Sequence, residues 1–89
     1  MIRRIVIYTG RVQGVGFRWT TNHLAKGFEV SGFIENRTDG TVYMVAEGNE
    51  SVVEAFMHSI SSRMTTNIID TMQSDGLYTG EFENFSVHY

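Results

Sequence analysis

The chain has 89 residues, 42% of them hydrophobic and 19% charged, which is the composition of an ordinary globular protein with one domain, residues 1–89. Its net charge of −3 argues against a nucleic-acid partner, because binding a polyphosphate backbone usually requires a basic face. No apolar run approaches the roughly 20 residues of a membrane span, so no membrane partner is expected either.

The first half of the chain predicts a strand, a loop, a helix and a hairpin. Residues 4–9 are rich in β-branched and aromatic side chains and predict a strand that ends in a glycine. Residues 17–26 predict a helix, with an apolar stripe made of Phe17, Leu24, Ala25 and Phe28. Residues 30–36 and 41–47 are strand-like, and the Thr-Asp-Gly sequence between them predicts that they form a hairpin.

The second half predicts one long helix and two weaker strands. Ser51 and Glu54 have the spacing of a capping box, so a helix is expected to begin there, with Asn49 as the alternative cap. Its apolar residues repeat at steps of three and four, which predicts that they face the core: Val52, Val53, Phe56, Met57, Ile60 and Met64. Residues 67–73 and 82–89 are the weaker strands.

The order of elements predicts an α+β fold of the ferredoxin-like βαββαβ type. In this fold an antiparallel sheet carries two helices on one face. The prediction leaves function open, because the fold supports many unrelated activities.

The most informative segment is the glycine-bearing loop of residues 10–18, Gly-Arg-Val-Gln-Gly-Val-Gly-Phe-Arg, between a predicted strand and a predicted helix. Neither the P-loop motif nor the dinucleotide-binding fingerprint fits, because position 15 is Val and position 19 is Trp. The physical features of an anion site are still present. Backbone N–H groups of a bent loop and of a helix N-terminus attract negative charge. Arg18 can add paired hydrogen bonds to phosphate oxygens. On spacing alone, a glycine-rich connector with a solvated arginine remains an equal alternative.

The same loop resembles the first motif of the acylphosphatase family residue for residue. A second stretch, Gly-Phe-Ile-Glu-Asn at residues 32–36, followed by Asp-Gly at 39–40 and Glu-Gly at 47–48, resembles the second motif with the same spacing. The final residues, 79–89, are similar to the last strand of the family. The resemblance therefore spans most of the chain and implies hydrolysis of acyl phosphates.

The resemblance also implies a role for each matching residue. Arg18 would hold the phosphate, and Asn36 would orient the attacking water. The backbone amides of the loop would cradle the phosphate; its residues are Gln13, Gly14, Val15, Gly16, Phe17 and Arg18. The family uses no metal or other cofactor and forms no phosphoenzyme, so a small acyl phosphate is the expected partner.

Other residues are expected to have structural or surface roles. Glu35 stands where the family commonly has Lys or Arg, and it should point to the face of its strand opposite Asn36. Trp19 is expected in the core. The three histidines, His23, His58 and His88, lack the spacing of metal ligands, so no metal site is expected.

One alternative function stays open: a non-catalytic module of the same fold that binds anions without turnover. The chain contains no cysteine and begins without the apolar stretch of a signal peptide, which favours the cytoplasm. A monomer is expected from the resemblance and from the absence of an evident apolar surface stripe.

Overall fold

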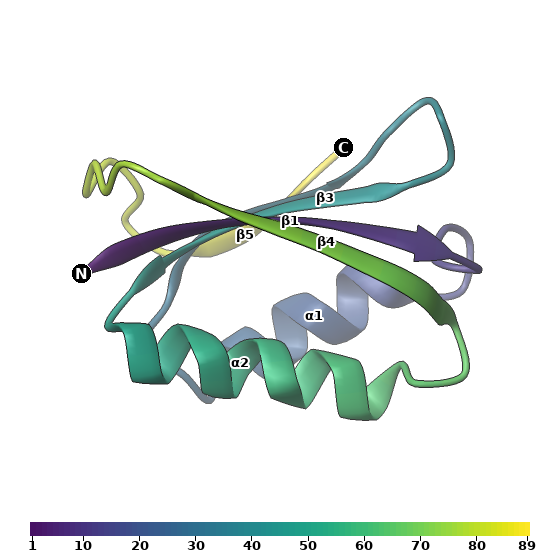
Figure 1. Cartoon of the computed structure of the whole chain (residues 1–89), viewed down its shortest axis with the longest axis horizontal. Coiled ribbons are helices and arrows are strands. Elements are labelled where there is room, and N and C mark those ends of the chain that lie inside the picture. The colour runs from purple at the N-terminus through teal and green to yellow at the C-terminus, as the bar shows by residue number, and fades with distance from the viewer.

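The computed structural model describes all 89 residues and contains five strands and two helices (Figure 1). In chain order they are β1 (Ile2–Gly10), α1 (Phe17–Ala25), β2 (Ser31–Asn36), β3 (Val42–Gly48), α2 (Glu50–Arg63), β4 (Ile68–Gly76) and β5 (Phe85–His88). Every predicted element is present, with ends that differ by a few residues. Neither helix has the length and hydropathy needed to cross a membrane.

The strands form a single sheet in the order β4-β1-β3-β2-β5. β1 pairs antiparallel with β3 and β4, and β2 pairs antiparallel with β3. β5 instead pairs parallel with β2. The α+β ferredoxin-like class is confirmed, but the sheet is mixed rather than wholly antiparallel. The reason is that residues 77–84 reverse the chain once after β4, so that β5 reaches the opposite edge running in the direction of β2.

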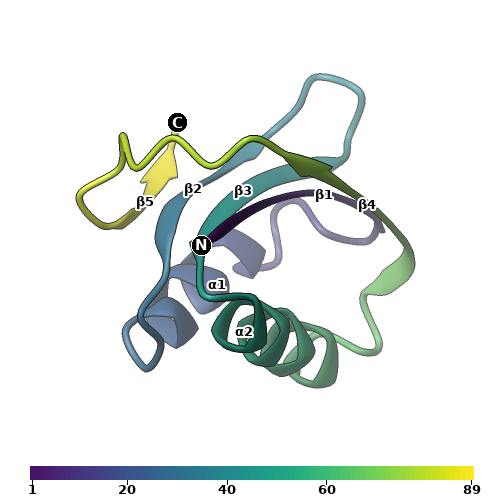
Figure 2. The same cartoon turned by 60° about the vertical axis from the view of Figure 1, so that its left-hand side comes forward.

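Both helices pack on the same face of this sheet, as Figure 2 shows. The core lies between the two layers and contains, among others, Val6, Tyr8, Ile34, Met44, Phe56 and Ile60, all of them fully buried. Every second residue of β1 from Arg4 to Tyr8 points into this layer. Of the residues predicted to form the stripe of α2, five are buried and Val52 is half-buried.

The start of α2 differs from the capping box that the sequence suggested. The helix begins at Glu50 and its N-cap is Asn49, the alternative cap. The Asn49 backbone carbonyl accepts hydrogen bonds from the N–H groups of Val52 and Val53, while its side chain makes no capping bond. Ser51 therefore lies inside the first turn, where its hydroxyl cannot act as the cap.

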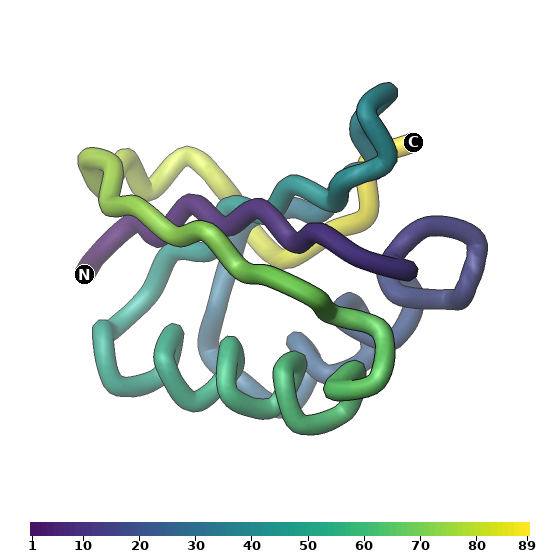
Figure 3. The backbone as a smooth tube through the Cα atoms, turned by 45° about the vertical axis from the view of Figure 1, so that its right-hand side comes forward, coloured from purple at the N-terminus to yellow at the C-terminus, as the bar shows by residue number.

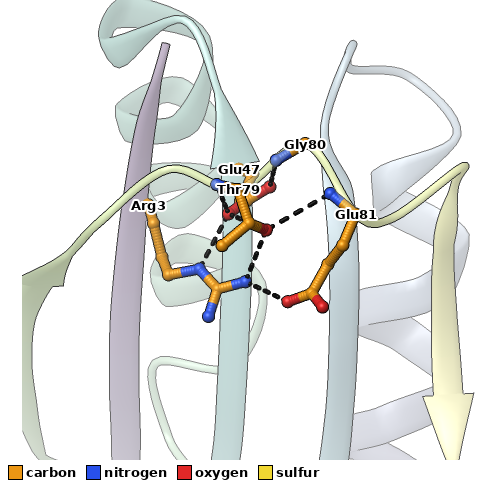
Figure 4. A network of polar contacts seen from close by, with 5 residues as sticks. All are labelled: Arg3, Glu47, Thr79, Gly80 and Glu81. Carbon is orange, nitrogen blue, oxygen red and sulfur yellow. Dashed lines mark hydrogen bonds and ion pairs between the residues drawn. The ribbon is translucent and has the colours of Figure 1, made fainter.

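The crossover between β4 and β5 is held by one buried carboxylate (Figure 4). Glu47 on β3 is 1% exposed. It accepts a 2.7 Å bond from Arg3 Nε and backbone N–H bonds from Thr79 and Gly80 at 3.0 and 3.1 Å. Burial opposes ionisation of this carboxyl, but the bonds from Arg3, Thr79 and Gly80 outweigh it and hold the pKa of Glu47 below its ordinary value. The network anchors the segment that places β5 at its edge of the sheet.

Three segments that are distant in sequence meet at one end of the molecule, on the right in Figure 3. They are the loop between β1 and α1, the turn between β2 and β3, and the residues that follow β5. The N-terminus lies at the opposite end. This convergence creates the candidate site.

Candidate active site

The loop between β1 and α1 bends through two glycines with positive φ. Gly14 has φ 74° and Gly16 has φ 78°, and a Cβ atom at either position would meet nothing within 4 Å. Gly16 is the N-cap of α1, and its carbonyl accepts the first helical bond, from Thr20 N–H at 2.9 Å. The first N–H groups of α1 have no partner within the helix, and no acidic residue occupies the first turn. The helix N-terminus is therefore available to an anion.

Arg18 lies in the first turn of α1 and borders the same space. One of its Nη1 hydrogens is donated to the carbonyl of His88 at 3.1 Å, and its guanidinium lies 4.9 Å from the centre of the Tyr89 ring. A guanidinium carries five N–H donors. No carboxylate pairs with Arg18, so most of its hydrogen-bonding capacity and its charge are free for a ligand.

Asn36 is the last residue of β2 and reaches the site from the other side. Its Oδ1 atom is buried and has no hydrogen-bond partner. An unpaired buried polar atom costs about 1–3 kcal/mol, so such atoms usually mark the position of a ligand or a water. Asn36, Gly14, Gly16, Phe17 and Arg18 line one pocket of about 220 Å³. The structure thus brings together five of the seven residues that the sequence singled out.

Two residues of the predicted phosphate loop do not line this pocket. Gln13 turns toward the hairpin, where its Nε2 donates to the carbonyls of Arg37 and Thr41 at 2.7 and 2.8 Å. Val15 is 39% exposed at the tip of the loop. The side chain of Gln13 therefore ties the loop to the β2–β3 turn, and a phosphate contact for either residue stays a prediction about its backbone.

The prediction that Trp19 lies in the core is wrong, because its side chain is 67% exposed. The buried face of α1 is formed by Phe17, Thr21 and Ala25 at four-residue steps. A residue two positions after Phe17 lies about 200° around the helix and so faces away from the core. The Trp19 ring stacks on His23, with ring centres 5.1 Å apart, and lines the pocket. The four-residue spacing was visible in the sequence and could have placed Trp19 on the outer face.

Sequence reasoning also missed Asn22, Val87 and Tyr89, which line the pocket together with the buried Val12. Asn22 carries no motif that would have marked it. The other two come from the C-terminal segment, and only the pairing of β5 with β2 places them beside α1. Glu35 does not line the pocket. No group of three or more His, Asp or Glu side chains is arranged to hold a metal ion.

Comparison with known proteins shows which family this chain belongs to. The acylphosphatase family model matches residues 4–87. The chain belongs to the acylphosphatase family. It is 40% identical over 83 residues to an acylphosphatase of Lactobacillus gasseri, covering 91% of each chain. It is 47% identical over 62 residues to the acylphosphatase of Geobacillus thermodenitrificans, covering 70% of this chain and 66% of that one.

The fold agrees with that of solved acylphosphatases. The crystal structure of acylphosphatase from Bacillus subtilis superimposes with a TM-score of 0.88 at 29% sequence identity, and each chain is covered completely. Family, relatives and fold together show that the chain is a hydrolase of the acylphosphatase type, as the motifs of residues 10–18 and 32–48 predicted.

Proposed function

We propose that this acylphosphatase binds the phosphoryl group of an acyl phosphate at the N-terminus of α1 and hydrolyses it with a water held by Asn36. One observation carries the proposal: Asn36, whose Oδ1 has no hydrogen-bond partner, lines the same pocket as the glycine loop and Arg18. A side-chain amide and a set of N–H donors that border one small space suit a water beside an anion.

The groups at the phosphate end of the pocket carry positive charge or partial positive charge. The free N–H groups of Gly16, Phe17 and Arg18 begin the helix, where its dipole favours negative charge. The Arg18 guanidinium adds charge-assisted hydrogen bonds, each worth about 1.5–3 kcal/mol. The first 37 residues carry six Lys or Arg against two Glu, but Arg3 and Arg4 are paired with carboxylates, and Arg18 is the cation that lines the pocket. These donors would stabilise the charge on the equatorial phosphate oxygens during transfer.

The water would be oriented rather than deprotonated. The side-chain amide of Asn36 can hydrogen-bond to the water, but an amide is too weak a base to remove its proton. The water oxygen forms a bond to phosphorus while the bond from phosphorus to the acyl oxygen breaks, which releases a carboxylate and inorganic phosphate. The proton of the water passes to a phosphate oxygen or to solvent. A carboxylate leaves readily without a general acid, so positioning and electrostatics can supply most of the rate.

The test is hydrolysis of acetyl phosphate and benzoyl phosphate in EDTA, compared with the spontaneous rate. Removal of one preorganised donor typically costs about 10²–10³ in rate, so Arg18→Ala and Asn36→Ala should each lose at least that much. Arg63→Ala removes an equal charge from the last turn of α2, outside the pocket, and should keep full activity. Inorganic phosphate should inhibit the wild-type protein by occupying the pocket.

Two other outcomes would change the proposal. Turnover that survives Asn36→Ala would remove the water-positioning role from this residue. A folded protein that binds phosphate without turnover would be an anion-binding module, the alternative function left open by the sequence.

We also propose that the enzyme works as a monomer in the cytoplasm. The absence of cysteine supports a reducing compartment. Light scattering during gel filtration should give the monomer mass of 10.1 kDa, and a mass near twice that value would contradict the monomer.

A further inference from the structure

We propose that the acyl group of the substrate lies in a groove between α1 and β5, so that the enzyme favours acyl phosphates with an extended apolar chain. This inference rests on the proposed function, because it places the second half of the same substrate. The groove has a volume of about 720 Å³, against about 220 Å³ for the phosphate pocket. A phosphate with its water occupies most of the smaller space, so a larger acyl group must extend beyond it.

The groove adjoins the pocket. Asn22, Val87 and Tyr89 line both of them. α1 runs away from the phosphate loop, and β5 runs parallel to β2, which ends at Asn36. The groove therefore begins at the reacting group and follows α1 toward its C-terminal end, a distance of about 10 Å between Arg18 and Ala25. Figure 2 shows β5 at the edge of the sheet with α1 beneath it.

Six of the eleven residues that line the groove are apolar, and the other five are Asn22, Lys26, Glu83, Asn84 and Ser86. Its apolar residues are Ala25, Phe28, Val30, Phe85, Val87 and Tyr89. Phe28 and Phe85 both pack against Phe56 of α2, with ring centres 5.6 and 5.3 Å away, so the floor is an extension of the core. Lys26 and Glu83 lie at the ends of α1 and β5 that are distant from the pocket. The apolar floor fits a hydrocarbon chain whose phosphate head lies in the neighbouring pocket.

Alkyl phosphonates test the groove separately from catalysis, because their carbon–phosphorus bond is not hydrolysed. Complete burial of one methylene is worth about 0.8 kcal/mol, or roughly fourfold in affinity. Because the groove is open on one side, we expect octylphosphonate to bind at least about tenfold more tightly than methylphosphonate. Titration calorimetry on the full chain measures both affinities. Arg18→Ala should lower the affinity for both ligands, because the phosphonate head group of each lies in the phosphate pocket.

Amide chemical shifts of the labelled protein locate the chain. Methylphosphonate should shift the signals of the loop and the first turn of α1 alone. Octylphosphonate should also shift residues 25–28 and 84–87. A matched pair of variants adds a second readout: Val30→Thr places a hydroxyl on the groove wall and should cut the advantage of the octyl chain by about two- to threefold. Val52→Thr makes the same exchange on α2 and should leave it unchanged.

The outcomes separate this inference from the proposed function. If the two phosphonates bind with equal affinity and shift only the signals of the loop, the proposal that the groove binds the acyl chain is wrong, even if the enzyme hydrolyses acetyl phosphate. Octylphosphonate binding that survives Arg18→Ala, with shifts on the open face of the sheet, would overturn it too. If octylphosphonate binds more tightly than methylphosphonate but acetyl phosphate is not hydrolysed, the groove is supported and the proposed catalysis is wrong.

Discussion

Tyr8 is fully buried on the core face of β1, and its hydroxyl has no hydrogen-bond partner. Burial raises the pKa of Tyr8 well above its ordinary value, so the group remains a neutral phenol. Its ring packs against Phe17 at a centre distance of 5.0 Å, beneath the start of α1. The aromatic ring contributes to the core, whereas the hydroxyl adds only a desolvation cost.

We therefore expect Tyr8→Phe to raise the free energy of unfolding by about 1 kcal/mol, because an unpaired buried hydroxyl costs about 1–3 kcal/mol. Urea denaturation measures the change. Tyr43→Phe, at a half-buried position on the open face, serves as the control and should change little. A loss of stability in Tyr8→Phe would mean that the hydroxyl has a partner, such as a buried water.

Alanine substitutions of the two glycines that flank α1 should change the free energy of unfolding by different amounts. Gly16 has φ 78°, where an alanine is strained by about 1–2 kcal/mol. Gly27 has no positive φ, and a Cβ there would lie 3.5 Å from the Leu24 carbonyl, an ordinary contact. We expect Gly16→Ala to lower the free energy of unfolding by about 1 kcal/mol and Gly27→Ala to be neutral or slightly stabilising. Thermal denaturation compares them, and equal effects would contradict the positive φ at Gly16.

At the scale of elements, the phosphate loop is connected to the β2–β3 turn by a single side chain. The amide of Gln13 donates both of its hydrogens to carbonyls of that turn. The turn directly follows Asn36, so this contact couples the part of the site that would bind phosphate to the part that would hold the water. Two neutral hydrogen bonds of this kind are worth about 1 kcal/mol each.

We expect Gln13→Met to leave the fold intact but to weaken inhibition by inorganic phosphate by about three- to tenfold, because the loop loses its anchor while keeping its length. Inhibition of acetyl phosphate hydrolysis gives the measurement. Gln73→Met makes the same exchange on β4, away from the loop, and should keep the wild-type inhibition constant. Unchanged inhibition in Gln13→Met would show that the loop holds its shape without this contact.

At the scale of the whole molecule, Glu47 couples stability to pH. Its folded pKa lies below its unfolded value, which is about 4.3, so its contribution is complete above that pH and is lost as the pH falls toward the folded pKa. We expect the free energy of unfolding to fall in acid below about pH 4.3, and Glu47→Gln to show a shallower fall. At neutral pH the variant should be less stable, because Arg3 loses one of its two charged partners, Glu47 and Glu81.

Denaturation at a series of pH values provides the comparison. Glu54→Gln is the matched control, because this carboxylate is exposed and lies 3.9 Å from Arg4. Parallel stability curves for the wild type and Glu47→Gln would contradict a lowered pKa. They would also weaken the idea that this carboxylate secures the crossover that carries β5.

Much of this protein was determined by local sequence patterns. The period of two in β1 and the steps of three and four residues in α2 predicted their buried faces, because each spacing repeats the geometry of the element itself. The glycines of residues 10–16 and the position of Arg18 were compatible with an anion site, since a bent loop and a helix N-terminus are formed by neighbouring residues, but a solvated connector was an equal alternative until the family motif favoured the site. The family motif added Asn36, which the spacing alone would have assigned to a turn.

The remaining features depend on contacts between distant segments. Local patterns could not show that β5 pairs parallel with β2, because that pairing depends on the reversal of residues 77–84 and on Glu47, more than thirty residues earlier. The same pairing carries Val87 and Tyr89 to the pocket and forms the groove beside α1. The sequence by itself therefore determined the elements and the family, and it predicted where a phosphate would bind. Only the tertiary structure decided which residues surround that place, because a strand at the edge of a sheet obtains its neighbours from the whole fold.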